Sequence, residues 1–302
     1  MTESTHPLAA FSEEAAQVVE RAAGSVVAVH GGGRRSASGI HWRAGVIVTA
    51  EETLERDEDI KVTLAGGREV PVTLAGRDPT TDVAVLRFPL PNPQAGEGGV
   101  AALPVASAEA ASLRAGQVVL AVGNHQGAPL ASLGIVALAG GPWHSQRGGT
   151  IDSFIRLDLT LAPAAEGGAV VDPNGRVVGM AVLGPRRRAL AIPAATIDRA
   201  VDQLLARGHV YRGYLGAGLQ AVRLAAGRGI LVASLDPQGP AARGGLLVGD
   251  IVTAWNEQPI ERVREVMRQL GTDSVGRTVD LALVRGGAAA SVKVVIGERA
   301  VA

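Results

Sequence analysis

A chain of 302 residues is long enough for two ordinary domains, each with its own core. The formal net charge is zero and hydrophobic residues make up 47%, which excludes a strongly basic nucleic-acid binder and a disordered acidic chain. The sequence contains no cysteine, so disulfides, thiolate catalysis and zinc–thiolate sites are excluded as well.

The N-terminal residues predict a short helix and no membrane segment. Ser12–Ala23 has the pattern of an amphipathic helix, with Ser12 as its N-cap. The residues before it lack a basic region joined to an apolar one, and no apolar run in the chain is long enough to cross a bilayer. We therefore expect a cytoplasmic protein without a membrane span.

Short apolar runs separated by turn residues follow, and they predict an all-β barrel or sandwich rather than βαβ units. The interval Pro89–Gly99 is rich in proline and glycine and predicts a surface loop. A helix over Ala194–Arg207, with Gly208 as its C-cap, closes this region. The predicted strands are Gly24–His30, Gly45–Ala50, Ile60–Leu64, Val70–Ala75, Val83–Phe88, Val118–Val122, Gly134–Ala139, Phe154–Leu161, Ala169–Val171 and Val177–Leu183.

The pattern then restarts with strands from Tyr211, a helix over Arg262–Leu270 and final strands at Val279–Val284 and Ala290–Ile296. We expect a domain boundary near Ala206–Arg212. The predicted organisation is a helical segment over residues 1–23, a first domain over 24–207 and a second over 212–299.

Three stretches in the first domain carry a resemblance to a known family: Gly45–Leu54, Asp78–Arg87, and Asp158–Ala169 followed by Asn174–Gly179. Their order and content resemble the segments that present the histidine, aspartate and serine of HtrA proteases. The resemblance implies a mostly β chain, with a trypsin-like double β-barrel (the chymotrypsin fold) followed by a small α+β PDZ domain.

The match at the catalytic positions is incomplete. Asp82 stands where the family has its aspartate, but Glu52 replaces the histidine and Glu166 replaces the serine. In the loop that forms the oxyanion hole, Ala164 replaces a glycine and Gly167 is retained. Because the Ser–His–Asp mechanism needs a hydroxyl nucleophile and an imidazole base, we expect a protein that is not an enzyme but a pseudoprotease with a scaffolding or regulatory role.

The alternative is an active serine endopeptidase of protein quality control whose nucleophile is not recognised. No serine lies between Ser153 and Ser234, so the loop offers no shifted nucleophile. We expect His41 to lie in a surface turn rather than to act as a displaced base. A pair of acids can hydrolyse peptides by activating water, but no sequence feature favours that reaction here.

The resemblance brings Glu52, Asp82 and Glu166 to one cleft, where three carboxylates repel each other and at least one pKa should be raised. An arginine or a metal ion could neutralise them, and the run Arg186–Arg188 is the nearest candidate in sequence. The alternative is that Glu52 and Glu166 point into water. Under that alternative, which we favour, the chain has no metal site and no cofactor.

The second domain resembles an HtrA-type PDZ domain at Tyr214–Ala217 and Gly239–Val252. A glycine-containing turn exposes backbone N–H groups that can bind a terminal carboxylate, and a peptide can add to the next strand. Val263, Val266, Met267 and Leu270 give the helix one apolar face, shared between core and groove. The predicted peptide-binding residues are Tyr214, Leu215, Gly216, Ala217, Leu219, Val263, Met267 and Leu270.

The resemblance also implies the partners. We expect polypeptide C-termini or unfolded protein segments as ligands, further copies of this chain or an active paralogue as assembly partners, and no nucleic acid.

Overall fold

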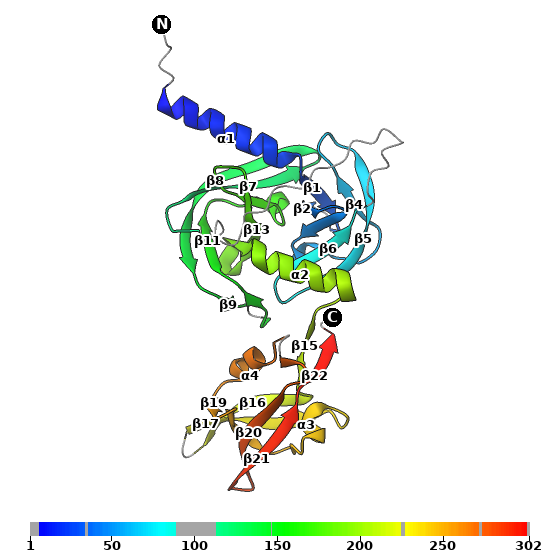
Figure 1. Ribbon diagram of the computed structural model, residues 1–302, viewed down its shortest axis with the longest axis vertical. Helices are drawn as coiled ribbons and strands as arrows, with labels where there is room; N and C mark the ends of the chain where they lie inside the picture. Colours follow the sequence, from blue (N-terminus) through cyan, green and yellow to red (C-terminus); the bar gives the residue numbers. More distant parts are fainter. Residues whose placement is uncertain are drawn as a thin grey trace. The chain divides into compact units, whose positions relative to one another are not determined.

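The computed structural model of the protein describes residues 6–33, 36–88, 113–145, 147–224, 227–271 and 274–300. The predicted loop Pro89–Gly99 lies outside these ranges. The chain divides into two compact units (Figure 1), the first formed by Met1–Trp143 and Thr150–Gly208, the second by His144–Gly149 and His209–Ala302. None of the helices in these ranges has the length and apolar character needed to span a membrane.

The first unit contains two closed six-stranded antiparallel barrels, which confirms the predicted mostly β, trypsin-like class. The order around the first barrel is β1(Val26–His30), β2(Ala37–Arg43), β3(Val46–Thr49), β6(Val83–Arg87), β5(Glu69–Asp78) and β4(Ile60–Thr63). The order around the second is β11(Phe154–Asp158), β14(Arg188–Pro193), β13(Val177–Gly184), β12(Ala169–Val171), β7(Val118–His125) and β8(Ala128–Gly140). Two short strands, β9(Trp143–His144) and β10(Thr150–Ile151), form a separate pair.

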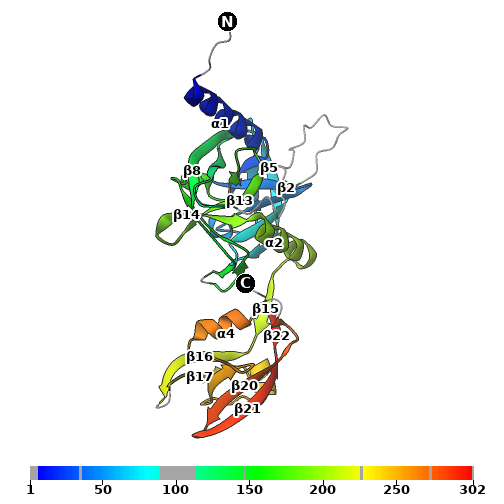
Figure 2. The same ribbon diagram turned by 60° about the vertical axis from the view of Figure 1, so that its left-hand side comes forward.

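Two helices pack on the barrels. The helix α1(Pro7–Ala23) lies beside β7 and β8, and α2(Ala194–Arg207) lies against β5, β6 and β13, so that it spans both barrels (Figures 1 and 2). The prediction for α2 is confirmed, including Gly208 in the left-handed conformation at its C-cap. The prediction for α1 began too late, because the side chain of His6 accepts a hydrogen bond from Leu8 N–H and Pro7 occupies the first turn.

The strand β2 was not predicted, and its central residue His41 was placed wrongly in a surface turn. His41 is buried within β2, and nearly every residue of the strand is buried. The reason is that β2 packs on its own barrel and also on β7 of the second barrel, so its residues do not alternate between apolar and polar. The strand β14(Arg188–Pro193), which begins at the last residue of the Arg186–Arg188 run, was missed as well.

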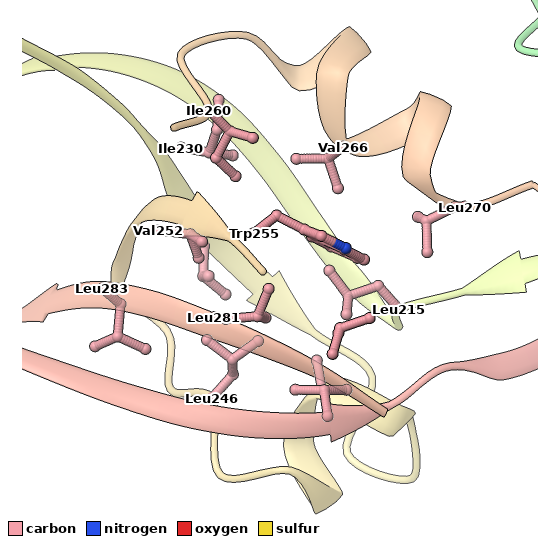
Figure 3. Close-up of a cluster of buried hydrophobic side chains, with 14 of the residues drawn as sticks. Leu215, Ile230, Leu246, Val252, Trp255, Ile260, Val266, Leu270, Leu281 and Leu283 are labelled. Atoms are coloured by element: carbon pink, nitrogen blue, oxygen red, sulfur yellow. The ribbon is translucent and has the colours of Figure 1, made fainter. Parts of the chain in front are cut away.

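The second unit is a sheet with strand order β16(Ala217–Leu224), β17(Gly227–Leu235), β18(Ile251–Trp255), β20(Thr278–Arg285) and β21(Ala288–Val295). The short strand β19(Gln258–Pro259) pairs with β18, and β15(Tyr211–Tyr214) pairs with β22(Gly297–Ala300). Two helices, α3(Pro240–Arg243) and α4(Val263–Gln269), complete it. Figure 3 shows the core, with the Trp255 indole between Val266 and Leu270 on the helix side and Leu281 on the strand side.

Candidate functional site

The structure brings Glu52, Asp82 and Glu166 to one place between the barrels. Glu52 lies on the short helix η1(Glu51–Thr53) that follows β3, and Asp82 lies in the turn between β5 and β6. The backbone N–H of Glu52 donates a hydrogen bond of 3.0 Å to Oδ1 of Asp82. Glu166 follows the short helix η3(Pro163–Ala165), and its charge acts on Asp82.

The pKa of Asp82 is raised to about 7, chiefly because burial disfavours the charged carboxylate. The hydrogen bond from Glu52 N–H opposes this rise, while the charges of Glu52, Glu166 and Glu51 add to it. The expectation of a raised pKa in this cluster is therefore confirmed. Repulsion between the carboxylates is the smaller cause, and burial is the larger.

Glu51, next to Glu52, is held by Arg77 of β5. The Arg77 guanidinium lies 3.2 Å from the Glu51 carboxylate and also donates to the carbonyl oxygens of Leu54 and Arg56, at 2.8 Å each. A single arginine therefore fixes the path of the segment that carries Glu52.

Glu166 does not point into water, so that expectation is wrong for this residue. Its Oε1 accepts a hydrogen bond of 3.0 Å from Leu183 N–H on β13, and its carbonyl oxygen accepts one of 2.8 Å from Ser38 N–H on β2. Burial raises the pKa of Glu166, and the Leu183 hydrogen bond and the charge of Arg187 lower it in part. Glu166 thus joins the loop after η3 to both barrels.

Ser38 was not identified from the sequence, yet its polar groups join this loop to β3 and β7. It is fully buried in β2; its hydroxyl donates to the carbonyl of Ala164 at 2.6 Å and accepts from Asn124 N–H at 2.9 Å. Its carbonyl accepts from the Thr49 hydroxyl at 2.7 Å. A serine between glycine-rich flanks in an unpredicted strand gives no sequence signal of this role.

The backbone N–H groups of the loop are largely used inside the first unit. Glu166 N–H donates to Pro163 O at 3.3 Å, and Gly167 N–H donates to Ala181 O at 2.8 Å. Gly167 has φ +82°, and a Cβ there would lie 2.2 Å from the Ser38 carbonyl oxygen, so only glycine fits. An oxyanion hole of the trypsin type needs two free donors, and in this conformation the Glu166 N–H is already engaged.

The chemical groups at the three positions are therefore carboxyl groups, and Asp82, with its pKa of about 7, is partly protonated at neutral pH. Within the described ranges, no group of three or more His, Asp or Glu residues is arranged to hold a metal ion. Arg187 belongs to the run Arg186–Arg188, the nearest candidate in sequence for neutralising the cluster. Its charge lowers the pKa of Glu166 in part, but within the described residues it forms no ion pair with the three carboxylates.

The second unit presents a loop suited to a carboxylate at Tyr214–Ala217. Gly216 has φ +76°, and a Cβ there would lie 2.9 Å from Gly239 Cα. The carbonyls of Leu215 and Gly216 accept hydrogen bonds from Ala241 and Asp236, but their N–H groups donate none to the described part of the chain. Successive free N–H groups in such a turn form an anion-binding concavity.

The helix α4 lies alongside β16, and its C-terminal end lies next to this loop (Figures 1 and 2). A Cβ on Gly213 would lie 3.1 Å from Leu270 Cα. Of the four apolar residues on the helix face, Val266 and Leu270 are buried in the core, Val263 is half-buried and Met267 is 42% exposed. Ala217 and Leu219 of β16 are half-buried against the same core.

Comparisons with known proteins agree with both units. Residues 37–180 match the trypsin-like peptidase domain family and residues 213–296 match the PDZ domain family. A probable periplasmic serine endoprotease, DegP-like, from Brucella suis is 32% identical, and the match covers 83% of this chain and 50% of the relative. The periplasmic serine endoprotease DegP of Escherichia coli is 30% identical, and the match covers 80% of this chain and 52% of the relative. The chain thus spans about half the length of the curated relatives it matches.

Solved structures agree as well. A serine endoprotease from Yersinia pestis has a TM-score of 0.73 and 30% identity, with 94% of this chain and 97% of that chain covered. The HtrA-type protease AlgW, solved with a decapeptide, has a TM-score of 0.73 and 27% identity, with 94% and 98% covered.

These relatives contradict two expectations from the sequence. They are named serine endoproteases, so the expectation that the chain is not an enzyme, which rested on the residues of the catalytic and oxyanion positions, is wrong. They are named periplasmic, so the expectation of a cytoplasmic location is wrong too.

Proposed function

The chain belongs to the HtrA-type protease family, in which a trypsin-like peptidase domain precedes a PDZ domain, and on this premise we propose that it captures polypeptides by their C-terminal ends. The observation that carries the proposal is the pair of N–H groups at Leu215 and Gly216, which donate no hydrogen bond within the described residues. A terminal carboxylate accepts hydrogen bonds from such groups. The similarity to AlgW, solved with a decapeptide, supports the assignment.

The bound segment adds to β16 as an extended strand on the side of α4. Alternate side chains of an extended peptide face the same way. The last side chain therefore lies near Leu270 and the third from the end lies near Met267 and Val263. Apolar residues fit both places, which also suits segments exposed by unfolded proteins. Because the relatives are named periplasmic, we also propose a periplasmic location.

Isothermal titration of the full chain with two forms of one peptide tests this function. The peptide ends in apolar residues and carries either a free C-terminal carboxylate or an amide. We expect the free acid to bind at least about tenfold more tightly, because only it places a charge on the 214–217 loop. Equal affinities would contradict capture by the terminal carboxylate.

Hydrolysis of the captured chain is a second candidate function, favoured by the relatives, which are named serine endoproteases. Ser38 is fully buried and offers no accessible hydroxyl. We propose that exposed Glu52 takes a proton from a water molecule as the water oxygen bonds to the peptide carbonyl carbon. Protonated Asp82, with a pKa of about 7, donates a proton to the leaving nitrogen as the C–N bond breaks.

Cleavage of unfolded casein and of a quenched fluorescent peptide tests the second candidate. We expect turnover that is lost in Asp82→Asn and Glu52→Gln and is unaffected by a sulfonyl fluoride, which reacts with activated serines. Turnover that survives both substitutions, or no turnover in the native protein, would contradict this mechanism. A variant with Glu52→His, Ala164→Gly, Ala165→Asn and Glu166→Ser serves as a positive control, since it restores the groups that the Ser–His–Asp mechanism needs.

A further inference from the structure

The turn between β13 and β14 carries three consecutive exposed arginines. The short helix η4(Pro185–Arg187) and the first residue of β14 supply Arg186, Arg187 and Arg188. Arg186 has φ 58° and Arg187 has φ 55°, so two successive residues with a Cβ adopt the left-handed conformation. Such residues are uncommon outside glycine and point to a function more often than ordinary turn residues do.

The side chains of these three arginines stabilise no other part of the fold within the described residues. They form no hydrogen bond and no ion pair there, whereas Arg77 and Arg285 each bind a carboxylate and backbone carbonyls. Three guanidinium groups are therefore presented to solvent on one tight turn.

The turn borders the acidic site. Leu183, on the same hairpin, donates its N–H to Glu166, and the charge of Arg187 acts on Glu166. A ligand at the Glu52/Asp82/Glu166 site thus passes close to the three arginines.

We propose that Arg186, Arg187 and Arg188 form a binding surface for acidic side chains of a polypeptide that enters the site of the barrel domain. Guanidinium groups bind carboxylates in a bidentate geometry, and a cluster of them attracts an acidic segment from solution. A polypeptide is favoured over a nucleic acid because the turn holds no aromatic residue for base stacking.

The proposal rests on the proposed function only in that the ligand is a polypeptide, because the arginines lie in the barrel domain and the C-terminal carboxylate is bound by the second unit. The test is fluorescence anisotropy of the full chain with a labelled peptide that has a central run of glutamates and a C-terminal amide, which removes the charge that the 214–217 loop would bind. The control peptide, the twin of the first, has the same sequence with glutamine in place of each glutamate. We expect the acidic peptide to bind at least about tenfold more tightly than the twin, with affinity falling as salt is added.

The triple variant Arg186→Gln, Arg187→Gln and Arg188→Gln should lose this preference, and the matched variant Arg223→Gln, Arg228→Gln and Arg277→Gln in the second unit should keep it. Equal binding of the acidic peptide by the native protein and the first variant would overturn the proposal. Equal affinity for a single-stranded oligonucleotide would show an unselective anion surface and would overturn it too. A peptide without acidic residues but with a free carboxylate measures the PDZ function separately, and the first variant should bind it unchanged.

Discussion

The carboxylate of Glu166 accepts a hydrogen bond of 3.0 Å from the backbone N–H of Leu183, so a side chain at the position of the family's serine fastens its own loop to β13. The same residue is tied to β2 through Ser38 N–H. Glu166 is therefore a structural element of the site as well as a member of the acidic group, and its replacement should affect the fold of the loop.

Replacing Glu166 by alanine should lower the free energy of unfolding by about 1–2 kcal/mol, because Leu183 N–H loses its acceptor in a partly buried place. Glu166→Gln retains an oxygen acceptor and removes a charge that burial disfavours, so it should cost less. Urea unfolding followed by circular dichroism compares the two. Equal losses would show that the hydrogen bond does not hold the loop.

The pH dependence of stability should report Asp82. Its pKa rises from 3.8 in the unfolded chain to about 7 in the fold, so the folded state takes up a proton in this range. The contribution of Asp82 to the free energy of unfolding is fully present below about pH 4. It decreases by at most about 4 kcal/mol as the pH rises to about 7 and beyond. Asp82→Asn keeps an acceptor for Glu52 N–H but cannot titrate.

The measurement is the melting temperature of the native protein and of Asp82→Asn from about pH 5 to pH 8. We expect the native protein to lose stability relative to the variant as the pH rises. If the difference in melting temperature between the two proteins stays constant over this pH range, the carboxyl group of Asp82 titrates as it does in water.

Ser38→Ala should destabilise the first unit by about 2–3 kcal/mol, since it leaves the Ala164 carbonyl and the Asn124 N–H without a partner in a buried place. Ser132→Ala is the matched control, because the Ser132 hydroxyl donates one hydrogen bond, to Thr160 O, near the surface. We expect less than about 1 kcal/mol for the control in the same urea titration. If both variants lose a similar free energy of unfolding, the hydrogen bonds of Ser38 do not join the barrels.

Met267→Glu should weaken binding of a C-terminal peptide by about tenfold or more, since it places a charge on the apolar side of the groove. Stability should change little because Met267 is 42% exposed. Val295→Glu is the control on β21, where Val295 is 57% exposed. If both variants bind the peptide like the native protein, the groove beside α4 is not the binding surface.

Much of the fold could be predicted because most strands in the barrels carry uninterrupted apolar runs, as Val83–Arg87 and Val177–Gly184 do. The strand β2 could not, since Ser38 bonds to the other barrel and Gly39 packs closely against neighbouring strands of its own barrel, so neither residue reflects strand propensity. A Cβ on Gly39 would lie 2.9 Å from Ile47 Cγ2, a contact that no local pattern reveals.

The site was predictable in position but not in chemistry. The motifs around Glu52, Asp82 and Glu166 locate the three residues, and like charges predict a raised pKa. The dominant effect on Asp82 is burial, which depends on how the turn at residues 79–82 packs in three dimensions. The hydrogen bond from Leu183 to Glu166 joins β13 to the turn after η3, 17 residues earlier in the chain, so no local pattern indicates that this side chain points inward.

Nuclear magnetic resonance of the ¹⁵N-labelled protein, titrated with a peptide that ends in apolar residues, tests capture of the C-terminus most directly. We expect the amide resonances of Leu215 and Gly216 to move downfield with the free acid and not with the C-terminal amide, because these N–H groups then begin to donate to a carboxylate. Shifts of equal size with both peptides, or shifts confined to other residues, would contradict it.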